Sequence, residues 1–185
     1  MIFEQRRAGG DRNFSYLIGD EAAGVALLVD PAGAPESALE RSGELDLEIE
    51  TIVHTHGHAD HTAGTAELRH ASGADLLVHE ALAAHLIGPA SEVAAAAGFP
   101  RRAHILGDIL SYHTTPVEAA GIAAESEVGL LVLTHLVPAP DNAIAKRLFM
   151  SGVAEAWDGE VVLGEDGLHL WMPSSSSEIQ REMLD

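Results

Sequence analysis

The sequence contains no cysteine among its 185 residues. Disulfide bonds and thiolate ligands are therefore excluded, and any bound metal has to be held by nitrogen and oxygen atoms. Because a chain without disulfides has no need of an oxidising compartment, we expect a cytoplasmic location, although the absence of cysteine is compatible with others.

Basic residues are few. Lys and Arg number 10 against 29 Asp and Glu, which gives a formal net charge of −19. A charge of this sign repels phosphate backbones. The pair Arg101-Arg102 is a small basic cluster, and two arginines do not make a nucleic-acid-binding arm. We therefore expect no nucleic-acid partner.

Long hydrophobic runs are absent as well. No apolar stretch approaches the roughly 20 residues needed to cross a bilayer, and no basic and apolar leader opens the sequence. Neither a membrane partner nor secretion is therefore indicated. The 46% hydrophobic content and the mean hydropathy of +0.10 favour one globular domain over residues 1–173. The Ser-rich segment that follows predicts a mobile tail over residues 174–185.

The most informative feature is the run 54–61, which follows the apolar segment 49–53. It contains the pattern His-x-His-x-Asp-His, formed by His56, His58, Asp60 and His61. Neutral imidazoles and carboxylates are the usual ligands of zinc and of the harder first-row metals. Side chains alternate along an extended segment, so His56 and His58 point the same way, and the pair in the following turn can face a second ion. The run predicts a metal site.

This motif resembles the metal-binding loop of the metallo-β-lactamase superfamily, which implies an α/β fold, the αββα sandwich, and usually a dinuclear centre. Residues 1–74 resemble the glyoxalase II-like branch, through segments 9–20, 29–31 and 51–64. Residues 75–185 are similar instead to the ribonuclease Z and arylsulfatase-like hydrolases, through segments 74–80, 112–120 and 133–136. Because the chain is short for the superfamily, we expect a shortened sandwich.

The resemblance implies a set of metal ligands. His56 and His58 would bind one ion, and Asp60 and His61 would bind a second, with His135 completing the second position. The implied cofactor is zinc, as one or two ions, with manganese or iron as alternatives.

The resemblance also implies catalytic roles. His113 matches a family histidine that contacts the departing group of the substrate, and Glu80 matches a glutamate that hydrogen-bonds this histidine. An imidazole oriented by a carboxylate is suited to act as a general acid. Asp60 would orient the attacking water if it does not bind the second ion.

Two ligands of the family pattern are missing. Dinuclear members normally contribute a further His and a bridging Asp that follows Gly, and neither full segment is found here. Asp108, within residues 107–110, is a candidate substitute for the bridging Asp, and His104 lies four residues earlier. His79 and His85 are further candidates.

These features predict a metal-dependent hydrolase in which a metal-activated water attacks a small-molecule phosphodiester, other activated ester, thioester or lactone. One alternative is a mononuclear iron oxygenase, because persulfide dioxygenases share this fold and loop. Another is a catalytically silent metal-binding or dimerisation domain, because the bridging Asp is missing. Strands lost with the missing section would leave sheet edges uncovered, so we expect a homodimer, with or without exchanged elements.

The hydrophobic pattern predicts the elements. Strands are expected over 3–8, 14–19, 25–29, 49–53, 76–79 and 130–134, with a hairpin over 161–172 that turns at 165–167. Helices are expected over 35–42, 65–70, 81–87, 91–97, 116–125 and 142–149, with breaks at 88–89 and 98–100.

Overall fold

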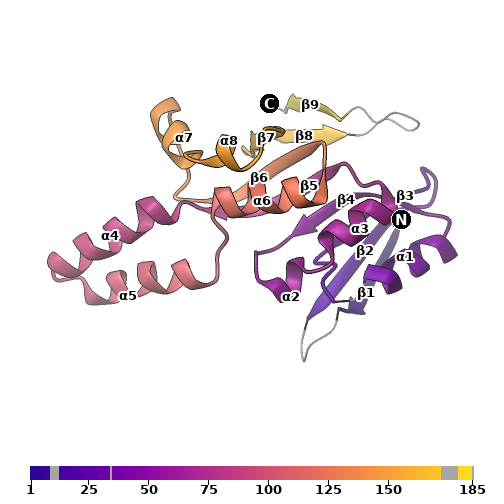
Figure 1. Cartoon of the computed structure of the whole chain (residues 1–185), viewed down its shortest axis with the longest axis horizontal. Helices are drawn as coiled ribbons and strands as arrows, with labels where there is room; N and C mark the ends of the chain where they lie inside the picture. The colour runs from indigo at the N-terminus through magenta and orange to yellow at the C-terminus, as the bar shows by residue number, and fades with distance from the viewer. Residues whose placement is uncertain (9–12, 34, 172–178, 185) are drawn as a thin grey trace.

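The structure is a computed structural model that describes residues 1–8, 13–33, 35–171 and 179–184. Its centre is a seven-stranded sheet whose strands follow one another in sequence order (Figure 1). These strands are β1 (Ile2–Arg7), β2 (Phe14–Asp20), β3 (Val25–Val29), β4 (Glu48–His54), β5 (Leu76–Leu82), β6 (Leu130–Val137) and β7 (Glu160–Leu163). The first three pair antiparallel, and β3 to β7 pair parallel. The carboxyl ends of β3 to β7 therefore share one edge of the sheet.

One face of the sheet is covered by helices. These are α1 (Pro35–Glu44), α3 (Thr65–Ser72), α6 (Pro116–Ser126) and α8 (Val153–Ala156). Alternate strand residues such as Leu28, Ile52 and Leu77 point into this layer and are fully buried against Leu68 of α3 and Ala120 of α6. Burial of these apolar side chains is the main stabilising contribution to the fold.

The opposite face is covered unevenly. A two-stranded sheet, formed by β8 (Leu168–Trp171) and β9 (Gln180–Met183), contributes to a second hydrophobic cluster. In that cluster Leu168 and Leu170 pack against Leu130 and Val132 of β6. Over β1 to β3 the same face carries Phe3, Tyr16, Ile18, Leu27 and Val29, of which Phe3 is 63% exposed and the others are half-buried.

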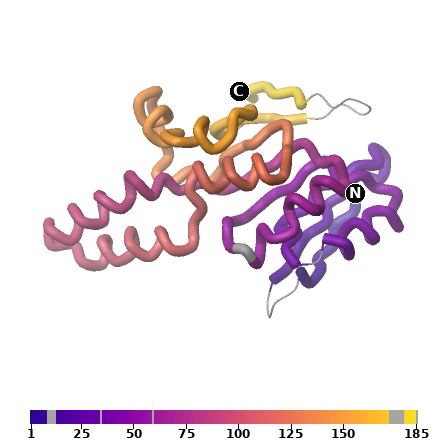
Figure 2. Tube along the Cα trace, in the orientation of Figure 1, coloured from indigo at the N-terminus to yellow at the C-terminus, as the bar shows by residue number. Residues whose placement is uncertain are grey.

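The remaining helices are α2 (Ala59–Thr62), α4 (Ala84–Ala96), α5 (Pro100–Asp108), a 3-10 turn η1 (Ile109–Ser111) and α7 (Ala143–Phe149). α4 and α5 form a helical hairpin that projects away from the sheet (Figure 1, Figure 2). No helix within the described residues is long and apolar enough to cross a membrane.

The α/β class is confirmed, and the shortening is visible in the second sheet, which has two strands within the described residues. Three local predictions are wrong. α4 continues through Gly88-Pro89, where a break was predicted. An alanine-rich helix that packs on α5 tolerates the loss of the one backbone hydrogen bond that proline cannot make. Residues 100–108 are helical although no element was predicted there. Residues 81–82 continue β5 rather than begin a helix.

The hairpin predicted over 161–172 is also wrong. The chain does turn at 165–167, where Gly167 has a φ of +88° and Leu168 N–H donates to Glu165 O at 3.0 Å. However, β7 pairs parallel with β6, whereas β8 pairs with β9. Of the predicted tail, residues 180–183 form β9, and 174–178 lie outside the described residues.

Candidate active site

The predicted site lies at the shared carboxyl edge of the parallel strands. β4 ends at His54 and leads directly into the loop 55–61, while β5 carries Glu80 and β6 carries His135 near the same edge. In open α/β sheets this edge is where loops from neighbouring strands meet and bind ligands.

Asp30, at the end of β3, anchors the loop. Its buried carboxylate accepts hydrogen bonds from Thr55 N–H at 2.8 Å and from Thr55 Oγ1 at 2.6 Å. Its Oδ2 also lies 3.1 Å from His61 Nδ1, within ion-pair distance, although the angle is not that of a hydrogen bond. Both ends of the loop are thus held by one carboxylate, which leaves Nε2 of His61 to face away from it.

The imidazoles of the motif gather in the loop. The His56 ring lies 3.9 Å from the His61 ring and 4.8 Å from the His58 ring, measured between centroids. Burial, together with the neighbouring His61 and His58, lowers the pKa of His56. The neutral imidazole that a metal requires is therefore favoured.

The imidazoles and the carboxylate of the loop are suitable metal ligands, but their side chains do not converge on one point. Within the described residues, no group of three or more His, Asp or Glu side chains is arranged to hold an ion as it stands. His61 Nδ1 is nevertheless buried without a hydrogen bond among those residues. A change of side-chain rotamer in the loop would be needed to converge the imidazoles on one point.

Asp60 is exposed at the outer side of the loop. Its Oδ2 accepts a hydrogen bond from Asn13 Nδ2 at 2.6 Å and lies 4.0 Å from His61 Nε2. The Asn13 hydrogen bond holds the pKa of the Asp60 carboxyl below its ordinary value. Asp60 is therefore ionised and beside His61, as the motif predicts for a second ligand pair.

Glu80 and His113 form the contact that the resemblance predicts. Glu80 is 1% exposed, and its Oε2 lies 2.9 Å from Nδ1 of His113, while its Oε1 accepts from Thr114 N–H at 2.6 Å. Because an ionised carboxylate only accepts, His113 donates through Nδ1 and presents Nε2 outwards. Leu82 N–H donates to Thr114 O at 2.7 Å, and this hydrogen bond joins the two ends of the segment that contains α4 and α5.

His135 lies beside His113 rather than in a contact with Asp60. The two imidazoles stack with centroids 5.7 Å apart. His135 has a φ of +43° and Asp30 a φ of +48°, a backbone conformation that non-glycine residues rarely adopt. Such strain concentrates at functional sites, which supports a functional position for both residues. The part of His135 in a second metal position stays a prediction.

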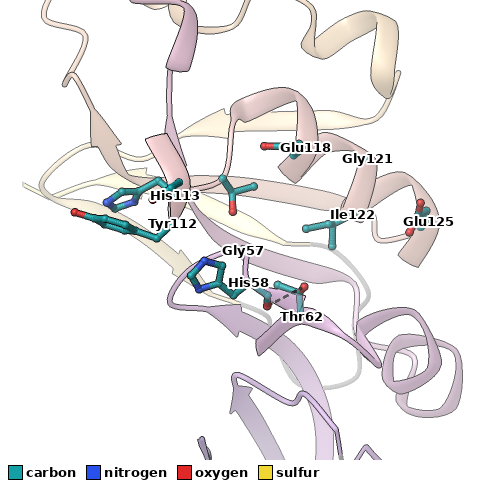
Figure 3. Close-up of a pocket in the computed structure, with 11 residues that line it drawn as sticks. Gly57, His58, Thr62, Tyr112, His113, Glu118, Gly121, Ile122 and Glu125 are labelled. Atoms are coloured by element: carbon teal, nitrogen blue, oxygen red, sulfur yellow. Dashed lines mark hydrogen bonds between the residues drawn. The ribbon is translucent and has the colours of Figure 1, made fainter. Parts of the chain in front are cut away.

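One cleft of about 480 Å³ is lined by Gly57 and His58 of the loop and by His113, which Glu80 orients from behind (Figure 3). His58 and Thr62 line it on the loop side, and Tyr112 with His113 lines it on the other. The α6 helix closes it with Glu118, Gly121, Ile122 and Glu125. A cleft of this size admits a small-molecule substrate beside both sets of polar groups.

Gly57 lets the loop approach this cleft closely. A Cβ built on Gly57 would overlap the hydroxyl of Thr114, whose backbone Glu80 holds. A side chain at position 57 is therefore excluded sterically, and the loop is fixed against the segment that carries His113.

The substitute ligands are not brought to the loop. Asp108 and His104 are exposed on α5 and pair with each other at 3.3 Å, away from α2 (Figure 1). His85 contacts Leu148 O at 2.9 Å, and His79 is buried against His54 with ring centroids 5.2 Å apart. Their placement gives no support to these residues as ligands. Asp30, conversely, was not predicted, although an acid directly after an apolar strand was a usable signal.

Two known proteins are similar to part of this chain. The hydroxyacylglutathione hydrolase of Anaeromyxobacter dehalogenans (strain 2CP-C) is 49% identical over 79 residues, which are 43% of this chain and 29% of that protein. The cytoplasmic isozyme of hydroxyacylglutathione hydrolase from Saccharomyces cerevisiae (strain ATCC 204508 / S288c) is 35% identical over 65 residues, 35% of this chain and 24% of the yeast protein. The chain thus spans less than a third of the length of these relatives.

Two solved structures are also similar. ETHE1 from Myxococcus xanthus is 38% identical with a TM-score of 0.39, over 42% of this chain and 35% of that one. The metallo-beta-lactamase fold protein YhfI from Bacillus subtilis is 17% identical with a TM-score of 0.32, over 95% of this chain and 94% of that one.

A sequence model of one family extends over both halves of the chain, from residue 8 to residue 174. It includes the loop after β4, the Glu80–His113 pair and the strand that carries His135. The chain belongs to the metallo-beta-lactamase superfamily.

Proposed function

We propose that this protein is a metal-dependent hydrolase of small activated esters, with thioesters, lactones and phosphodiesters as the substrate classes to be compared. The observation that carries the proposal is the common cleft. His58 of the His-x-His-x-Asp-His loop and the carboxylate-oriented His113 line it from opposite sides.

The loop residues would hold the metal. His56 and His58 would bind one ion, and Asp60 with His61 would bind a second or position the attacking water. A bound zinc, manganese or iron ion would supply a more acidic water and a positive charge near the reacting carbonyl or phosphoryl oxygen. Asp30 keeps His61 in place from behind.

His113 would deliver a proton to the departing atom. Its Nδ1–H is fixed by Glu80, so Nε2 is the atom available to the substrate. The buried carboxylate is the counter-charge of the protonated imidazole, whose Nε2–H would be the proton donated to the leaving group.

The first test measures metal content per chain by plasma mass spectrometry, together with turnover on a panel of the three substrate classes. We expect one or two ions and measurable hydrolysis. His58→Ala should lose metal and at least about 100-fold in turnover, while His104→Ala, on the exposed α5, should lose neither. Bound iron with oxygen uptake in the presence of a persulfide would favour the oxygenase instead.

A catalytically silent metal-binding domain is the second candidate. It is favoured by the lack of a ready three-ligand group within the described residues. Wild-type protein and His58→Ala would then be equally inactive on every ester, and that result would contradict the hydrolase.

A further inference from the structure

The charges around the cleft have one sign. Glu118 and Glu125 line it from α6, and within the described residues that line it there is no Lys or Arg (Figure 3). The nitrogen bases of the lining, His58 and His113, both belong to the proposed reaction centre. The groups that remain to meet the distant part of a substrate are therefore carboxylates, small polar residues and apolar side chains.

The two carboxylates differ in how freely they act. The Oε2 of Glu118 accepts hydrogen bonds from Thr115 N–H and Oγ1 in the capping box of α6, so part of its charge is engaged. Glu125 lies seven residues, or about two helical turns, further along the same side of α6 and has no ion-pair partner within the described residues. Glu125 is exposed to solvent, so its field acts on a substrate in the cleft most strongly at low ionic strength.

The rest of the molecule reinforces this field. The chain carries a net charge of −19, and a cleft with low-dielectric walls focuses the potential of the surrounding charges. Metal ions in the loop would offset this locally, at the reacting bond. They would not offset it along α6, where an ordinary ionic strength screens charges over about 8 Å.

The walls provide apolar contact as well. Tyr112 and Ile122 line the cleft, and Gly121 leaves room beside them because a Cβ there would meet nothing within 4 Å. A compact alkyl or aryl group fits this lining better than a polar chain.

From these observations we infer that the site selects esters whose distal portion is uncharged or positively charged, and rejects substrates with a distal carboxylate, such as glutathione thioesters. The inference rests on the proposed function for the place of the reacting bond. The charge of α6 carries it: Glu125 acts as a specificity-determining residue, and Glu118 contributes less because of its cap.

The test compares three 4-nitrophenyl esters of similar size: the pentanoate, the hemiglutarate and the 4-(trimethylammonio)butanoate. We expect kcat/KM of the cationic ester to exceed that of the anionic ester by about 10-fold or more at low salt, and the ratio to fall as salt is added. Glu125→Lys should lower this ratio by about 10-fold. Glu92→Lys, the same charge change on exposed α4 outside the cleft, should leave it within about 2-fold.

Equal kcat/KM for the three esters at low salt, or equal effects of the two lysine variants, would overturn the inference while leaving the hydrolase intact. If no ester is hydrolysed, the proposed function fails, and calorimetric binding of benzyltrimethylammonium and of phenylacetate decides the inference alone. Tighter binding of the cation, lost in Glu125→Lys and kept in Glu92→Lys, supports it. Equal binding of the two probes overturns it.

Discussion

Glu80 is a buried carboxylate whose two oxygens are both used, one by His113 Nδ1 and one by Thr114 N–H. In Glu80→Gln the amide still accepts from Thr114, but the imidazolium loses its counter-charge. We expect turnover to fall about 100-fold on esters with poor alkoxide leaving groups. The free energy of unfolding should fall by about 2 kcal/mol.

The leaving group separates a role in proton transfer from a structural one. A 4-nitrophenolate departs without a proton, so Glu80→Gln should keep most of its activity on 4-nitrophenyl esters. Steady-state kinetics on matched alkyl and 4-nitrophenyl esters measures the difference. An equal loss on both would show that Glu80 only supports the fold.

His79 gives the fold a dependence on pH. Burial lowers the pKa of His79 below the ordinary imidazole value of 6.5, and burial also lowers that of its neighbour His54. As pH falls below 6.5, the unfolded chain takes up protons that the folded chain refuses. The free energy of unfolding should therefore decrease towards acid, by about 1.4 kcal/mol per pH unit for each proton.

Urea unfolding between about pH 7.5 and about pH 5.5, with a chelator present throughout, measures this slope. In His79→Gln the slope should become smaller, whereas His104→Gln, on the exposed side of α5, should leave it unchanged. An unaltered slope in His79→Gln would exclude His79 as a source of the dependence.

Single residues were predictable where a motif or a family match marked them. The Glu80–His113 hydrogen bond was expected and is present at 2.9 Å. Asp30 was missed because its role depends on Thr55 and His61, which reach it only through the parallel pairing of β3 with β4. The Gly-Asp pattern at Asp108 was misleading, because in a helix it places the carboxylate on an exposed face beside His104.

At the scale of elements, the loop after β4 and the segment before α6 behave as one assembly through Gly57. In Gly57→Ala the new Cβ meets the hydroxyl of Thr114, which is buried and has little room to move. The loop should shift outwards, and turnover should fall about 100-fold, since small misplacements of catalytic groups have effects of that size.

Metal affinity and kinetics measured on the same preparation test this shift. Gly43→Ala in α1 is the matched control, because a Cβ there meets nothing within 4 Å. Truncating the clashing side chain in the double variant Gly57→Ala/Thr114→Ala should restore part of the activity. Wild-type activity in Gly57→Ala would show that the contact is not needed.

Elements with a clear period and a cap were predictable within one or two residues. The helix expected over 116–125 is α6, with Thr115 as the cap and Glu118 completing the capping box. The pairing of the last three strands, β7, β8 and β9, was not predictable from the sequence. The pattern over 161–172 is the same for a hairpin and for two strands that belong to different sheets, so only the tertiary structure distinguishes the two cases.

On the scale of the whole molecule, the main departure from a closed sandwich is the face of β1 to β3 that the described residues leave uncovered. Phe3 is 63% exposed on it, and Tyr16 and Ile18 are half-buried beside it. Apolar faces of this kind are normally covered, and a second copy can do so through the same patch on both subunits. We expect a dimer of twice the 19.4 kDa chain mass.

Light scattering at micromolar concentration measures this mass. Phe3→Glu should dissociate the dimer, while Phe99→Glu, a similarly exposed phenylalanine next to α5 at 58% exposure, should not. A wild-type protein that is wholly monomeric under these conditions would contradict the expectation. Whether elements are exchanged between subunits would follow from mixing chains of two isotopic labels.

The class of fold could be predicted from the sequence, because the His-x-His-x-Asp-His motif resembles the metal-binding loop of a superfamily with that fold. The predicted likeness to glyoxalase II agrees with the relatives named hydroxyacylglutathione hydrolase, one of which matches 43% of the chain. The likeness of residues 75–185 to the ribonuclease Z and arylsulfatase-like hydrolases stays a prediction. The cleft could not be predicted, because it forms between a segment of the first half (57–62) and a segment of the second half (111–125) that only the fold brings together.

The backbone hydrogen bond from Leu82 N–H to Thr114 O joins the two ends of the segment 83–113 beside Glu80. Such a closed base lets the α4–α5 hairpin change in length or composition without altering the distance between Glu80 and His113. We therefore expect that the α4–α5 hairpin can be replaced by another segment without disturbing the strands that carry Glu80 and His135. Hairpins of different length or sequence could then be carried beside the same Glu80–His113 pair.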